Sequence, residues 1–151
     1  MATTVVFSAL LPDHAEILNE HRVAFEDLRV QMVANGWLRG GARPLKIVQE
    51  ILERDLIPAD SIGYQEVVGV AIGDQIVEME NYRWLTVTVD GQAEPAVCHP
   101  VKSVFISPLS AVIKRFARGE RQFDASHFVY ESIRIARENA ALPNTGDIEL
   151  A

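Results

Sequence analysis

The chain has 151 residues, of which 48% are hydrophobic and 23% are charged, and its formal net charge is -7. This length and composition fit one globular domain with its own hydrophobic core, and they exclude disorder as the main state. A net negative charge repels phosphate backbones, so we expect no nucleic-acid partner, and the single cysteine, Cys98, excludes an intrachain disulfide.

The charge is unevenly distributed along the chain. Residues 1–80 contain thirteen Asp and Glu against six Lys and Arg, a balance of -7, whereas residues 81–151 contain eight of each, a balance of zero. Such acidic charge keeps a protein in solution, which is the more general explanation. It also suits a partner protein with a basic surface.

No targeting or membrane segment is expected. The apolar run Val5–Phe7 has no Lys or Arg before it, unlike a secretory signal. No apolar stretch approaches the roughly 20 residues that span a bilayer. The sequence therefore predicts a cytoplasmic protein that does not bind membranes.

The N-terminal half is predicted to be mainly helical. We expect a short strand or an extended lead-in at residues 3–10, and helices at about residues 13–34 and 44–55. A third helix is expected to begin at Ser61 or Tyr64 and to run to about Asn81. Apolar residues at spacings of three and four form the expected buried stripe of the third helix: Val68, Ile72, Ile76 and Met79.

Two glycines, Gly69 and Gly73, lie one turn apart beside that stripe. Each costs about 1 kcal/mol relative to alanine inside a helix, so their positions need a reason. We predict that a neighbouring strand or helix approaches the third helix closely there; a bound ligand is the less favoured alternative.

The clearest strand signal follows the third helix. Residues 84–89 alternate, with Leu85, Val87 and Val89 on one face, and Asp90-Gly91 is typical of a hairpin turn. Returning strands at 96–98 and 104–106 complete a predicted three-stranded antiparallel meander.

Two helices are expected at the C-terminal end. Ser107 is predicted to cap the first, which begins at Pro108 and ends at Gly119. Asp124 is predicted to cap the second, which runs to about residue 140, with an inward face of Phe128, Ser132, Ile135 and Ala136. The order of elements predicts one α+β domain over residues 1–140, with a frayed tail at 141–151.

Part of this pattern resembles a bacterial family of domains of unknown function. The resemblance covers about Val68 to Arg121. It consists of a helix with the motif Gly-x-x-x-Gly-acid, whose acidic residue is Asp74, a strand that begins with Trp84, and a helix that begins at Pro108 with the motif Pro-x-Ser-x-x-x-Lys-Arg. Ser107 departs from the phenylalanine of the family pattern, and Asp74 from the commoner glutamate. The resemblance implies a fold and brings no catalytic residue with it.

No group of polar residues in the sequence has the spacing of a known catalytic or metal-binding motif. His14 and His21 are seven residues apart rather than the four typical of helical metal ligands, so we predict no metal and no other cofactor. Adjacent residues of a strand point to opposite faces, so His99 does not activate Cys98 if both belong to a strand. An enzyme is therefore the less favoured class.

We predict a protein-interaction domain, in its most specific form an adaptor or immunity-type protein that binds a basic partner. The expected contact residues are Glu66, Asp74 and Glu78 on one side of the third helix with Val70 beside them, and the loop residue Trp37. The alternative is a ligand-binding protein or enzyme with a pocket between the third helix and the sheet, lined by Asp74, Trp84, Thr86 and His99. A homo-oligomer is a third hypothesis.

Overall fold

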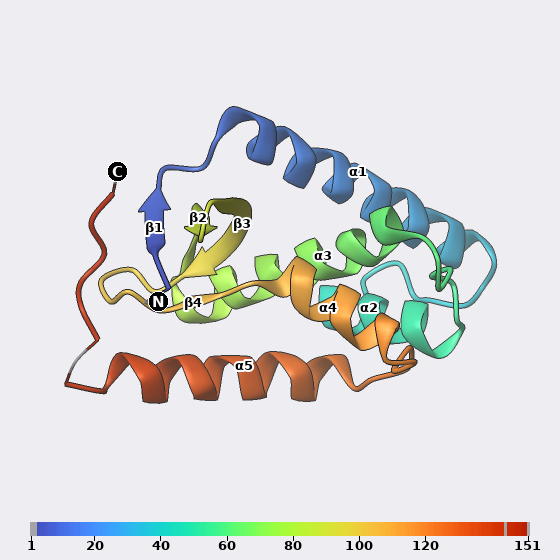
Figure 1. Ribbon diagram of the computed structural model, residues 1–151. Helices are drawn as coiled ribbons and strands as arrows, with labels where there is room; N and C mark the ends of the chain where they lie inside the picture. The colour runs from blue at the N-terminus through green and yellow to red at the C-terminus, as the bar shows by residue number, and fades with distance from the viewer. Residues whose placement is uncertain (1–2, 144, 151) are drawn as a thin grey trace.

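A computed structural model describes residues 3–143 and 145–150, and it has the α+β architecture that the sequence predicts (Figure 1). Helices lie both before and after the strands along the chain. In chain order the elements are β1 (Val5–Ser8), α1 (Pro12–Ala34), α2 (Pro44–Glu53), α3 (Ile62–Glu80), β2 (Arg83–Val89), β3 (Gln92–Cys98), β4 (Phe105–Ile106), α4 (Pro108–Ala117) and α5 (Ala125–Ala140).

The sheet has four antiparallel strands in the order β1-β2-β3-β4, so the prediction of a three-stranded meander was wrong by one strand. β1 pairs with β2 from Val5 opposite Val89 to Ser8 opposite Thr86. This pairing joins segments about eighty residues apart in the chain. The local sequence of β1 therefore left open whether residues 3–10 form a strand, and the long-range pairing decides it.

The alternation predicted for β2 is confirmed by the packing of its two faces. Leu85 and Val87 pack with Phe7, Ala96 and Cys98 in a small core on one side of the sheet. On the other side, Trp84 and its cross-strand partner Val97 pack against the larger core, which the helices form. Both faces of the sheet thus carry buried apolar side chains, and the burial on each face contributes to stability.

Helix α3 is the centre of the fold, and the other four helices pack around it (Figure 1). Its middle, from Val67 to Gly73, is buried on every side, as expected for a helix that is apolar all round. Met79, predicted to lie on the buried stripe, is instead 55% exposed. Ile76 is buried, whereas Met79 is exposed in the last turn of the helix although helical spacing places it on the side of Ile72 and Ile76.

The two glycines of α3 allow close approach of neighbouring elements, as predicted. A Cβ atom at Gly69 would lie 2.7 Å from the Cα of Leu109, in the first turn of α4. A Cβ atom at Gly73 would lie 2.3 Å from Cζ2 of Trp84 and 3.0 Å from Cγ of Pro108. The absence of side chains at these two positions therefore lets α4 and the Trp84 indole pack directly on the α3 backbone.

The inward face of α5 differs from the prediction at one position. Phe128 and Ala136 are buried as expected, and Val129 and Ile133 complete the face, whereas Ile135 is exposed. The buried positions 128, 129, 133 and 136 centre the inward face between Phe128 and Ile133, which leaves Ile135 just outside the edge of that face.

The C-terminal segment lies against the sheet in its described part. The Ser103 amide donates to the Gly146 carbonyl at 2.6 Å, and the Ile148 amide donates to the Val101 carbonyl at 2.7 Å. Leu150 forms an isolated parallel bridge with Phe7 of β1. Within residues 3–143 and 145–150, no helix is both long enough and apolar enough to cross a membrane.

Candidate functional site

The residues predicted to form an acidic contact surface on α3 do not share one open face. Val70 is 1% exposed and packs with Leu18 and Leu109 beneath α1. The Glu66 carboxylate lies 3.4 Å from His21 Nε2 of α1. Glu78 is exposed and accepts a hydrogen bond from Gln75 at 3.3 Å. Because α1 covers this side of α3, most of the predicted surface is used inside the molecule.

Asp74 joins three elements through its carboxylate. Arg22 of α1 donates to both carboxylate oxygens, from Nε at 2.9 Å and from Nη2 at 2.8 Å. The Trp84 indole N–H of β2 donates to Oδ1 at 2.9 Å. The hydrogen bonds to Asp74 raise the pKa of the Arg22 guanidinium above its usual value. Asp74 is therefore held as a structural link between α1, α3 and the sheet.

Trp37 lies at the end of α1 and is partly available to a partner. The Trp37 amide donates to the Met32 carbonyl at 2.9 Å and the Gly36 amide donates to the Val33 carbonyl at 3.0 Å, while Gly36 has a φ of 73°. These two bonds form a Schellman motif, which ends the helix and fixes the start of the loop. The Trp37 side chain is 38% exposed, and the Arg54 guanidinium lies 4.7 Å from the ring centroid.

The four residues of the alternative pocket are not assembled around a common space. The Trp84 indole occupies the gap between α3 and the sheet, since its ring carbons lie directly over Gly73. Thr86 is buried, and its Oγ1 accepts a hydrogen bond from the Leu11 amide at 3.0 Å and lies 2.9 Å from Nδ1 of His14. Thr86 thus ties the start of α1 to the sheet.

His99 lies apart from that gap, at the end of β3. Its Nδ1 accepts hydrogen bonds from the amides of Val101 and Lys102, at 3.1 and 2.9 Å, and its ring packs edge-on against Tyr82 with centroids 5.4 Å apart. These contacts shape the turn between β3 and β4. His99 therefore has a local structural partner for one ring nitrogen already.

Cys98 is fully buried in the smaller core, and burial raises the pKa of its thiol to about 12. A thiol needs to ionise to act as a nucleophile, so this environment disfavours that role. Among the residues that the structure describes, no group of three or more His, Cys, Asp or Glu side chains is arranged to hold a metal ion.

A polar cluster at the start of α4 was not predicted. The Glu94 carboxylate of β3 accepts a hydrogen bond from Ser107 Oγ at 2.7 Å and another from Ser110 Oγ at 2.5 Å. Ser107 is the residue before the helix, but its side chain forms no capping hydrogen bond, so the prediction of a capping role for its hydroxyl was wrong. The bond to Glu94 competes for the same hydroxyl. Only the tertiary structure brings Glu94 to these serines.

The outward side of α1 carries an exposed stripe of acidic and apolar residues. Its members recur at alternating spacings of four and three residues: Glu16, Glu20, Val23, Asp27 and Val30. Val23 is 63% exposed and Val30 is 52% exposed. None of the ion pairs formed between described residues involves Glu16, Glu20 or Asp27. We refer to these five residues as the α1 stripe.

The sequence contains a signal for this stripe. Spacings of three and four predict an inward face of α1 at Ile17, His21, Ala24, Leu28 and Met32, and the acidic positions of the stripe fall outside that face. The buried contacts of α1 are made mainly by Leu18 and Met32. The packing of Leu18 and Met32 against the rest of the protein leaves Val23 and Val30 exposed beside the carboxylates of the stripe.

Comparison with known proteins places the chain by sequence and by fold. The model of a family described as "Domain of unknown function (DUF3806)" matches residues 44–126, which contain the whole segment of the predicted resemblance. No curated protein matches the sequence.

A crystal structure of a protein from Bacteroides thetaiotaomicron VPI-5482 is similar, with a TM-score of 0.70 and 14% sequence identity. The similar region covers 86% of this chain and 47% of that chain, so this chain spans about half the length of that protein. At this identity the similarity establishes the fold alone.

Proposed function

We propose that this chain, which belongs to the DUF3806 family of domains of unknown function, is a protein-interaction domain that binds a basic partner through the α1 stripe. An adaptor or immunity-type role is the most specific form of this proposal. The observation that carries it is a pair of exposed valines bordered by carboxylates that have no cationic partner in the described ion pairs.

The composition of the stripe favours a helical partner with basic flanks. Glu16, Glu20 and Asp27 attract a cationic surface and accelerate its approach, while Val23 and Val30 offer apolar area that is released from water on contact. The alternating four- and three-residue spacing matches the seam along which two helices pack. The balance of -7 in residues 1–80 points in the same direction.

The alternative of a ligand pocket between α3 and the sheet has less support. The Trp84 indole fills the space beside Gly73, and its N–H is bonded to Asp74. A ligand there would have to displace a packed aromatic ring.

The experiment uses an amphipathic helical peptide of leucine and lysine as the probe, with a leucine and glutamate peptide of equal length as its counterpart. Binding is measured by isothermal titration calorimetry at low and at physiological salt. We expect the cationic peptide to bind and the anionic peptide not to bind, with affinity falling as salt rises.

Two triple variants with the same change in net charge locate the contact. Reversal of the stripe (Glu16→Lys, Glu20→Lys, Asp27→Lys) is expected to abolish binding of the cationic peptide. Reversal of three exposed acids elsewhere (Glu53→Lys, Asp60→Lys, Glu78→Lys) is expected to weaken it only slightly. Equal losses in both variants would mean that overall charge alone attracts the peptide. A loss in the second variant alone would place the contact near Glu53, Asp60 or Glu78. Either result overturns the proposal.

A further inference from the structure

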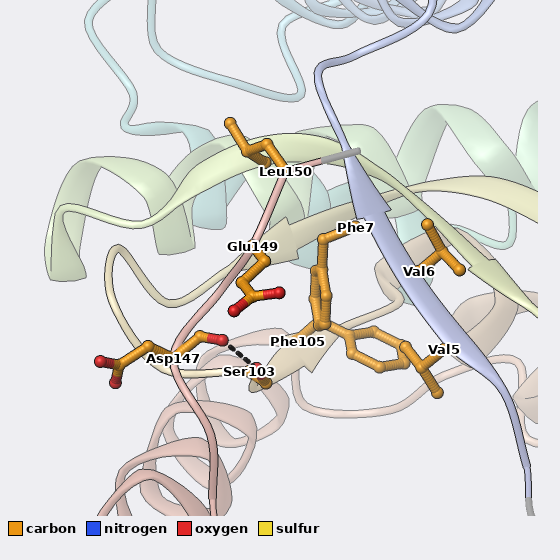
Figure 2. A pocket seen from close by; sticks show the side chains of 8 residues that line it. All are labelled: Val5, Val6, Phe7, Ser103, Phe105, Asp147, Glu149 and Leu150. Atoms are coloured by element: carbon orange, nitrogen blue, oxygen red, sulfur yellow. Dashed lines mark hydrogen bonds between the residues drawn. The ribbon is translucent and has the colours of Figure 1, made fainter.

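Strands β1 and β4 and the C-terminal segment lie at the end of the molecule opposite α2 (Figure 1). A groove lies between them (Figure 2). Its volume is about 530 Å³, which falls in the range of ligand-binding pockets. The residues that line it are Val5, Val6, Phe7, Ser103, Phe105, Asp147, Glu149 and Leu150.

The groove has a firmly built apolar wall. Phe7 of β1 and Phe105 of β4 meet edge to face, with ring centroids 5.8 Å apart, although the two strands are at opposite edges of the sheet. Both side chains lie on the face of the sheet that carries the smaller core, so they reach towards each other across it. Figure 2 shows the two rings side by side at the centre of the groove, with Val5 next to Phe105.

The C-terminal segment forms the facing wall and is held by backbone bonds. Ser103 donates to it twice, from its amide to the Gly146 carbonyl at 2.6 Å and from Oγ to the Asp147 carbonyl at 2.9 Å. The Asp147 carboxylate pairs with Lys102 at 3.2 Å. These contacts fix the direction of the residues that follow, including Glu149.

Asp147 is paired with Lys102, whereas the carboxylate of Glu149 forms no ion pair with another described residue. No ion pair or side-chain hydrogen bond formed between described residues involves Glu149. In Figure 2 its carboxylate is directed towards the middle of the groove and the Phe7 ring, whereas the Asp147 side chain points away. The groove thus combines aromatic walls with one carboxylate at its mouth.

We propose that this groove binds a lysine or arginine side chain carried by an extended segment of a partner protein. Such a side chain has an apolar stem that fits against Val5, Phe7 and Phe105, and a cationic end that pairs with Glu149. The volume of the groove exceeds that of one side chain and leaves room for part of the partner's backbone. This site is separate from the α1 stripe and does not depend on the function proposed for it.

The probe is an extended pentapeptide of alternating valine and threonine with a central lysine, blocked at both ends. The comparison peptide has norleucine in place of lysine, which keeps the stem and removes the charge. Binding is followed by NMR chemical-shift changes and by titration. We expect the lysine peptide to shift the signals of Val5, Phe7 and Phe105, and to bind about tenfold more tightly than the norleucine peptide.

Two variants and one control test the role of each wall. Glu149→Gln is expected to weaken the lysine peptide about five- to tenfold and to leave the norleucine peptide unchanged. Phe105→Leu is expected to weaken both peptides. Glu138→Gln, at an exposed acid of α5, is expected to change neither.

Three results would overturn the proposal. The first is equal affinity for the lysine and norleucine peptides, and the second is a set of shifted signals outside the groove. The third is concentration-dependent dimerisation of the chain, seen by light scattering, that Glu149→Gln or Phe105→Leu abolishes, because the groove would then hold a second copy. Since the α1 stripe is untouched in these variants, they should still bind the helical leucine and lysine peptide if that separate proposal is correct.

Discussion

Replacement of Gly73 by alanine tests the packing at the centre of the fold. The new Cβ atom would lie 2.3 Å from Cζ2 and 2.5 Å from Cη2 of Trp84, and 3.0 Å from Cγ of Pro108. These distances are far below van der Waals contact, so the indole has to move. When it moves, the bond from its N–H to the Asp74 carboxylate, now 2.9 Å, is lost or lengthened.

The size of the effect follows from three opposing contributions. Overpacking of a core costs about 1–3 kcal/mol, and loss of a hydrogen bond to a charged group costs about 1.5–3 kcal/mol. Alanine in place of glycine inside a helix returns about 1 kcal/mol. We expect a net loss of about 3 kcal/mol in the free energy of unfolding, which for a chain of this length lowers Tm by about 6–12 °C.

The same helix supplies a matched control. Gly63 lies in the first turn of α3, and a Cβ atom there would meet nothing within 4 Å. Gly63→Ala is therefore expected to raise stability slightly, by about 0.5–1 kcal/mol. Both variants are measured by urea denaturation followed by circular dichroism and by thermal unfolding.

A second substitution separates the collision from a general effect on α3. Trp84→Phe removes the distal ring carbons that Gly73→Ala would meet, so the double variant should be more stable than the sum of the single effects predicts, by about 1 kcal/mol or more. If Gly73→Ala and Gly63→Ala have the same stability, or if the double variant is simply additive, the indole is not packed on Gly73 as described.

Three further predictions concern the polar contacts and the buried thiol. Asp74→Asn removes the charge that holds Arg22 but keeps an acceptor for Trp84, so we expect the free energy of unfolding in urea to fall by about 1 kcal/mol, and by less at high salt. Asp74→Ala removes the acceptor as well and should lower it further. Equal losses in the two variants would contradict the role of this carboxylate as partner of both Arg22 and Trp84. Ser110→Ala removes one of the two hydroxyls bonded to Glu94 and should cost about 1–2 kcal/mol, an effect that disappears in a Glu94→Gln background if the charged bond is its source. Burial raises the pKa of the Cys98 thiol from 9.0 to about 12, so the folded state keeps the thiol neutral. The stability that this contributes is complete below about pH 9 and is lost as pH rises towards 12, and the loss reaches about 1–2 kcal/mol at pH 10. Cys98→Ala should remove that part of the pH dependence, and rapid reaction of the native thiol with iodoacetamide at pH 8 would refute the burial argument.

Much of the fold follows from local patterns in the sequence. The helical repeat of α2, α3 and α4, the strand alternation of β2 and the turn at Asp90-Gly91 all depend on residues close together in the chain, whose geometry a short segment fixes by itself. The purpose of Gly69 and Gly73 could be predicted as well, because two costly residues in one helix indicate a close neighbour.

The candidate surfaces could be predicted only in part. The negative charge of residues 1–80 is a property of composition, but which carboxylates remain available depends on their partners. Asp74 accepts hydrogen bonds from Arg22 and Trp84, and Glu94 accepts hydrogen bonds from two serines. All of these partners are more than ten residues away in the sequence except Trp84, which is ten residues from Asp74. Helical spacing puts Glu66, Val70 and Asp74 on one side of α3 without revealing that α1 covers that side.

The sequence by itself therefore determined the class of the fold, the order of its helices and strands, and the sign of its charge, because these depend on periodicity and composition. The tertiary structure alone decided that residues 5–8 pair with β2, that Val70 is buried, and that Phe7, Phe105 and Glu149 meet around one groove. Each of these depends on which face of one element packs against another. That choice is set by the summed burial of the whole core, and no short segment carries it.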